Sequence, residues 1–120
     1  MTVQDSVAVQ ALAARLGSDF QLGVASAAFQ IEGSLAAGGR GPSGWDAFVE
    51  KPGTIHDGHS PALACDHYNR TAEDVELMRT LGIDSYRFSL SWPRIQPDGT
   101  GPFNSEGLDF YDRLIDQLLE

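Results

Sequence analysis

The chain has 120 residues, of which 42% are apolar and 21% charged, and its 17 acidic and 8 basic side chains give a formal charge of -9. This composition is typical of a soluble globular protein, and the acidic balance argues against nucleic-acid binding, which requires clustered Lys and Arg. No apolar run approaches the roughly 20 residues that span a bilayer, residues 1–16 lack the pattern of a secretory leader, and Cys65 is the only cysteine, so we expect a cytoplasmic protein without membrane contact.

Residues 1–17 are predicted to form an N-terminal extension ahead of a domain spanning residues 18–120. A short helix ending at Gly17 and a mobile terminal segment explain this extension equally well. In residues 20–26 (FQLGVAS), apolar side chains at alternate positions predict a buried strand. The apolar positions of the extension are Val7, Val9, Ala11, Leu12 and Leu16.

Residues 27–64 are rich in Gly, Pro and aromatic side chains, which predicts a long structured loop with a short helix around residues 45–49. The glycine-rich residues 38–42 lack the Gly-Lys-Ser/Thr ending of a phosphate-binding loop, and we expect them to be flexible. Trp45 and Trp92 are able to stack on a sugar ring, but we expect both to pack in the core.

The clearest helix is predicted to begin at Thr71, with Asp74 completing a capping box and Gly82 as the stop residue. Apolar residues at helical spacing lie between them. The pattern then changes to period two over residues 83–92, which predicts a second strand with Arg87 and serines on one face.

A turn-rich segment with several prolines follows, and Ser105 is the predicted cap of a last helix. The alternation of strand and helix predicts an α/β fold with a parallel sheet. Two such units leave strand edges unpaired and apolar faces uncovered, and the helix reaches Glu120 without a stop signal. We therefore expect the chain to be part of a larger sheet. The apolar side of the last helix is predicted to contain Leu108, Tyr111, Leu114, Ile115, Leu118 and Leu119.

Polar residues near the strand ends are candidates for binding, because the ends of parallel strands carry ligand-binding groups. The Gln30 amide has two donors and an acceptor, which suits paired sugar hydroxyls. Glu32 is able to act as an acid, a base or a structural acceptor in a hydrogen-bonded loop. Arg87 needs a carboxylate partner if its side of the sheet is interior, and needs none if that side faces water.

A metal site is not expected. The potential ligands match no zinc pattern, because there is neither a paired Cys-x-x-Cys nor a His-Glu-x-x-His motif. The residues considered are His56, Asp57, His59, Cys65, Asp66 and His67.

The run FQLGVASAAFQIEGS at residues 20–34 resembles the N-terminal signature of family-1 glycoside hydrolases, the β-glucosidase family. The resemblance covers residues 18–120, with small departures at Leu22 and Asn69. It continues through Trp45–Phe48, Pro52–Ile55, Ala64–Tyr68, Glu73–Val75, Leu81–Ile83, Tyr86–Ile95, Gly107–Leu108 and Tyr111–Asp112.

This resemblance implies a (β/α)8 TIM barrel, of which the chain holds about the first two βα units. It also implies hydrolysis of β-linked glucosides or galactosides with retention, by two carboxyl groups about 5–5.5 Å apart. Gln30 matches the family's glutamine that binds sugar hydroxyls, and Arg87 matches the arginine that hydrogen-bonds the nucleophilic glutamate. The resemblance thus favours the interior orientation of Arg87. No cofactor is implied.

The family's two catalytic glutamates lie in Asn-Glu-Pro and Glu-Asn-Gly motifs, and neither string occurs in the 120 residues. Glu32 belongs to the N-terminal signature and is not expected to be catalytic. We therefore expect an inactive fragment of a β-glucosidase, whose partners are a β-glycoside or oligosaccharide and the remainder of the barrel. The alternative is a non-catalytic barrel fragment that oligomerises or complements a partner chain through its apolar faces.

Overall fold

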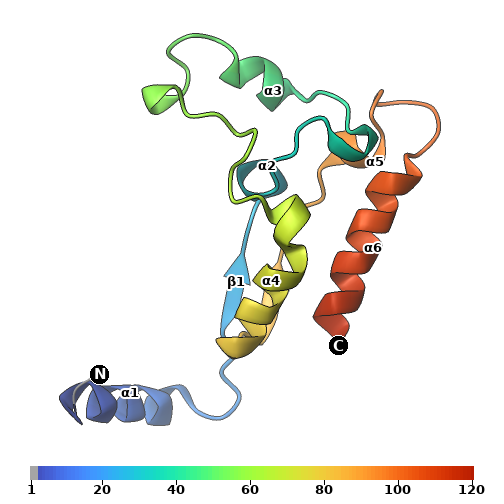
Figure 1. Ribbon diagram of the computed structural model, residues 1–120. Coiled ribbons are helices and arrows are strands. Elements are labelled where there is room, and N and C mark those ends of the chain that lie inside the picture. The colour runs from blue at the N-terminus through green and yellow to red at the C-terminus, as the bar shows by residue number, and fades with distance from the viewer. Residues whose placement is uncertain (1–2) are drawn as a thin grey trace.

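A two-stranded parallel sheet lies at the centre of the computed structural model, which describes residues 3–120. Strand β1 (Gly23–Ala25) pairs with β2 (Ser85–Arg87), with Val24 opposite Tyr86. The predicted parallel pairing is confirmed, although both strands are shorter than expected. Figure 1 shows the long connection between them, which carries α3 at one end of the molecule before α4 returns alongside the strands.

Helical segments make up most of the remaining structure. The N-terminal extension forms helix α1, which agrees with the helical alternative, and the helix ends next to Gly17 (φ +81°). In Figure 1 this helix lies apart from the other elements. The helices are α1 (Val3–Leu16), α2 (Ala28–Ile31), α3 (Gly44–Val49), α4 (His67–Thr80), α5 (Trp92–Ile95) and α6 (Ser105–Leu119), with short 3-10 turns η1 (Ala37–Gly39) and η2 (His56–Gly58).

The predicted start at Thr71 agrees with the uninterrupted part of α4, but one irregular turn that begins at His67 precedes it. The backbone breaks at Arg70 (φ -110°), and the Thr71 hydroxyl donates to the His67 carbonyl at 2.7 Å instead of capping a helix end. The Asp74 carboxylate lies 2.6 Å from Nδ1 of His67, and within residues 3–120 it makes no capping-box bond with the Thr71 N–H. The stop at Gly82 agrees with its φ of +67°.

The second strand is also shorter than the period-two pattern predicts, because β1 pairs only with Ser85–Arg87, and α5 begins at Trp92. Pro93 lies in the first turn of α5, where its missing N–H costs nothing. The Ser91 N–H donates to the Tyr111 hydroxyl at 2.6 Å, and this bond holds the segment against α6. The last helix has Asn104 rather than Ser105 as its N-cap residue.

The apolar core lies where α4, α5 and α6 meet. Tyr68 of α4 packs against Phe110 of α6 with ring centroids 4.7 Å apart. The predicted apolar side of α6 is buried at Tyr111 and Leu114, but Leu119 is exposed. The buried cluster consists of Val75, Ile95, Phe110, Tyr111 and Leu114.

Several side chains expected in the core are exposed. Trp45 and Trp92 are 59% and 54% exposed, so the core packing predicted for both is wrong within the described chain. The β1 residues are likewise exposed, although a buried strand was expected. The reason is that a sheet of two strands has no further strand or layer to cover these faces within residues 3–120. The radius of gyration is 18.4 Å, whereas a compact domain of this length has about 14 Å.

No helix within residues 3–120 combines the length and apolar character needed to cross a bilayer.

Gly107 allows α6 to approach α5 closely, and we expect Gly107→Ala to destabilise the chain. A Cβ at this position would lie 2.0 Å from the Arg94 carbonyl oxygen. Overpacking of this kind costs about 1–3 kcal/mol. Thermal unfolding followed by circular dichroism measures the effect. Gly44→Ala in α3 is the matched control, because a Cβ there meets nothing within 4 Å. Equal midpoints for both variants would contradict this expectation.

Candidate functional site

Gln30 and Arg87 lie at the same edge of the sheet. Gln30 belongs to α2, which follows β1, and Arg87 is the last residue of β2. The strands are parallel neighbours, so their carboxyl ends meet, and the Ser26 N–H donates to the Arg87 carbonyl at 3.0 Å. Both side chains are exposed. The carboxylate partner expected for Arg87 is not among residues 3–120.

Gln30 also lines an apolar pocket of about 660 Å³. Phe29 and Trp45 form part of its wall and stack on each other with ring centroids 5.9 Å apart. The pocket combines one amide side chain with aromatic surface, which is a suitable environment for a ligand that has both hydroxyl groups and apolar faces.

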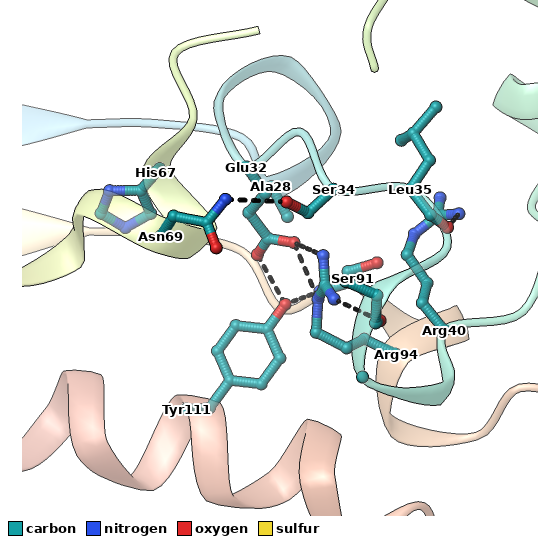
Figure 2. Close-up of polar contacts among 12 residues, drawn as sticks. Ala28, Glu32, Ser34, Leu35, Arg40, His67, Asn69, Ser91, Arg94 and Tyr111 are labelled. Atoms are coloured by element: carbon teal, nitrogen blue, oxygen red, sulfur yellow. Dashed lines mark hydrogen bonds and ion pairs between the residues drawn. The ribbon is translucent and has the colours of Figure 1, made fainter. Parts of the chain in front are cut away.

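Glu32 lies at the centre of a buried polar cluster (Figure 2). Its carboxylate accepts a 3.2 Å hydrogen bond from Nε of Arg94 and a 2.7 Å hydrogen bond from the Tyr111 hydroxyl. Nη2 of Arg94 is also 3.2 Å from Oε2 but without hydrogen-bond geometry. Arg94 is fully buried and Glu32 is 4% exposed.

The Tyr111 phenol remains a neutral donor in this cluster. Burial, together with the neighbouring Glu32 carboxylate, raises the pKa of Tyr111 well above its usual range. Both carboxylate oxygens of Glu32 are therefore occupied by donors from other elements. Of the three roles considered for Glu32, the structure shows that of a structural acceptor. With both oxygens engaged, Glu32 is not free to transfer a proton.

The glycine-rich residues 38–42 are packed, so the expectation of a flexible loop is wrong. Nη1 of Arg94 donates to the Ala37 carbonyl at 3.1 Å just before this segment. A Cβ at Gly41 would lie 2.2 Å from the Pro97 carbonyl oxygen. Gly38 and Gly39 have positive φ (+60° and +69°), a backbone conformation that glycine tolerates best.

The short helix α3 positions Trp45 beside the pocket. Ser43 and Asp46 form the two reciprocal bonds of a capping box, and Arg40 pairs with Asp46 at 2.8 Å. Although partial burial acts in the opposite direction, the hydrogen bonds from Arg40 and Ser43 hold the pKa of Asp46 below its usual range. This part of the long loop is thus ordered by local polar contacts.

The histidines and the cysteine do not converge. His67 is buried and pairs with Asp74, whereas His56, His59 and Cys65 are exposed. In the part of the chain that the structure describes, no three His, Cys, Asp or Glu side chains are grouped so as to hold a metal ion.

Sequence reasoning missed Arg94 and assigned Tyr111 only to an apolar helix face. Their partner Glu32 is 62 residues from Arg94 and 79 from Tyr111. A signal was nevertheless present, because Arg94 is a lone charge between Pro93 and Ile95. A charged residue in an apolar context indicates a paired partner.

Comparison with known proteins gives a consistent result. The profile of glycosyl hydrolase family 1 matches residues 12–120. A beta-glucosidase from an Agrobacterium species is 60% identical over 88% of this chain and 23% of its own length. Beta-glucosidase A from Thermotoga maritima is 55% identical over 84% of this chain and 23% of its own length. The chain therefore spans about a quarter of the length of these relatives.

Solved structures agree with the sequence comparisons. The beta-glucosidase of Thermotoga maritima in complex with a substituted glucoimidazole superposes with a TM-score of 0.82 at 53% identity, over 86% of this chain and 24% of that one. The virulence factor SghA in complex with its substrate analog salicin gives a TM-score of 0.86 at 56% identity, over 90% of this chain and 24% of that one.

Proposed function

Because the chain belongs to glycosyl hydrolase family 1 and has the fold of the N-terminal part of a (β/α)8 barrel, we propose that it supplies the first part of a retaining β-glucosidase site for β-linked glucosides or galactosides. The observation that carries this proposal is the position of Gln30 and Arg87 at the carboxyl edge of adjacent parallel strands. Active sites of these barrels lie at that edge. We extend the proposal to a cytoplasmic location.

In the proposed reaction one carboxyl group protonates the leaving oxygen and a second attacks the anomeric carbon, at a separation of about 5–5.5 Å. The Gln30 amide donates to one sugar hydroxyl and accepts from another. The Arg87 guanidinium hydrogen-bonds the attacking carboxylate, which orients it and favours its ionised form.

The two carboxyl groups must come from the rest of the barrel. The family's Asn-Glu-Pro and Glu-Asn-Gly motifs are absent from the 120 residues, and Glu32 is occupied by Arg94 and Tyr111. We therefore expect the isolated 120-residue chain to have no glycosidase activity, whereas the same residues should support turnover within a complete barrel.

A hybrid enzyme tests this expectation. Residues 12–120 replace the matching segment of the Agrobacterium beta-glucosidase, and the hybrid is assayed with a chromogenic β-glucoside. We expect turnover with the β-anomer as the first product, detected by NMR, and no turnover by the 120-residue chain alone. A folded hybrid without activity, or one that releases the α-anomer first, would refute the proposed function.

A second candidate function is non-catalytic association. It is favoured by the exposure of large apolar side chains on and near the sheet, such as Phe20 at 51% and Leu90 at 49%. Light scattering of the 120-residue chain, alone and mixed with the remainder of the barrel, distinguishes association from a monomeric state. Association with copies of itself, or with the remainder of the barrel, supports this candidate, whereas a stable monomer that binds neither contradicts it.

A further inference from the structure

We infer that Glu32, Arg94 and Tyr111 are positioning residues, whose buried cluster holds the short helix α2 and thereby the sugar-binding amide of Gln30. This inference rests on the proposed function, because it assigns the cluster a role in glycoside binding. It adds three residues that themselves do not touch the substrate.

The helix α2 is held at both ends. At its start, the Ala28 N–H donates to the Ser89 hydroxyl at 2.8 Å. At its end, the Glu32 N–H donates to the Ala28 carbonyl at 2.9 Å, and the Glu32 side chain enters the buried cluster. Gln30 lies between these two anchors with its own side chain exposed.

Each anchor has one partner in the segment that also carries Arg87, and Tyr111 of α6 completes the second anchor. Ser89 follows Arg87 closely in the chain, and Arg94 belongs to α5 after the same strand. The Ser26 and Tyr86 hydroxyls make a further hydrogen bond between the two strands. Gln30 and Arg87 are therefore fixed relative to each other by contacts that do not involve either side chain.

The cluster has little freedom to shift. The Arg94 guanidinium lies 4.0 Å from the centre of the Tyr68 ring, and Arg94 is fully buried. Next to Glu32, Gly33 has φ +64°, and a Cβ there would lie 2.2 Å from the Leu63 carbonyl oxygen. A backbone fixed in this way presents Gln30 before a sugar arrives, which lowers the entropic cost of binding.

Removing the Tyr111 hydroxyl tests this role in the hybrid enzyme. We expect Tyr111→Phe to raise KM for the β-glucoside about three- to tenfold, with a smaller change in kcat, because the bond to Glu32 and the bond from the Ser91 N–H are both lost. Tyr68→Phe is the matched control. It changes the same residue type in the same core, and the Tyr68 hydroxyl makes no hydrogen bond within residues 3–120. We expect its KM to be unchanged.

A double-mutant cycle separates positioning from general stability. If Tyr111 acts through Gln30, the variant with both Tyr111→Phe and Gln30→Ala has the same KM as Gln30→Ala alone. Additive effects of the two substitutions on KM would overturn the inference. A Tyr111→Phe hybrid that unfolds at a lower temperature, but has an unchanged KM in assays well below that temperature, would also overturn it. Glu32→Gln, which keeps the size of the side chain, provides the same cycle if Tyr111→Phe does not fold.

Amide hydrogen exchange gives a test that does not depend on turnover. We expect Tyr111→Phe to accelerate exchange of the amides of residues 28–32 at least tenfold relative to Tyr68→Phe, because the end of α2 is released. Equal exchange in both variants would overturn the inference. An inactive but folded hybrid would refute the proposed function alone, since the exchange rates would still decide whether the cluster holds α2.

Discussion

Replacing Arg94 by methionine is expected to lower the free energy of unfolding by about 3–5 kcal/mol, because it leaves the Glu32 carboxylate buried without its cation. Glu32 is 4% exposed and Arg94 is fully buried, so water cannot take the place of the guanidinium. The substitution also removes the bond to the Ala37 carbonyl, which holds the loop. Urea unfolding of the hybrid enzyme measures the loss.

Arg79→Met is the matched control for this effect. Arg79 also pairs with a glutamate at 2.7 Å, but both side chains are more than half exposed. Exposed pairs of this kind contribute little to stability. Adding Glu32→Gln to Arg94→Met should recover part of the loss, because the buried acceptor is then neutral. Similar stabilities of Arg94→Met and Arg79→Met would show that the buried pair does not stabilise the fold.

Replacing Arg87 by methionine is expected to reduce kcat of the hybrid about a hundredfold, because the attacking carboxylate loses the group that orients it. The pH dependence should also change. A neighbouring guanidinium favours the ionised carboxylate, so its removal raises the pKa of the nucleophile. The nucleophile must be ionised to react, and the acidic limb of the pH profile should therefore move to higher pH.

Stability measurements distinguish this effect from unfolding. The Arg87 side chain is exposed and makes no hydrogen bond within the described residues, so Arg87→Met should leave the urea midpoint of the 120-residue chain unchanged. Arg113→Met, at another exposed position, serves as the control for the loss of one positive charge. An Arg87→Met hybrid with normal kcat and an unshifted acidic limb would contradict the role proposed for Arg87.

Local patterns in the sequence predicted much of the fold. The period-two segment and the helical spacing after it depend only on neighbouring residues, so the order of strands and helices and the parallel pairing follow from them. The helix ends predicted at Gly17 and Gly82 agree with the structure, because both glycines have positive φ, which glycine tolerates best. The run of residues 20–34 was enough to indicate the family.

Helix starts and burial were predicted less well. The irregular turn of α4 from His67 was not predicted, and the Asp74 carboxylate contacts Nδ1 of His67 instead of completing a capping box. Trp45 and Trp92 are large aromatic residues of a type often found in cores, but both are exposed. Burial depends on which elements pack against a side chain. Spacing along the chain contains no information about such neighbours.

For this protein, the sequence alone determined the order of elements, the family and the candidates Gln30 and Arg87, because these depend on short contiguous motifs. Only the tertiary structure decided what Glu32 does. Its partners Arg94 and Tyr111 are 62 and 79 residues away, and they reach it only because α5 and α6 pack against the loop after β1. The role of a buried carboxylate is set by the donors around it, and folding brings those donors together.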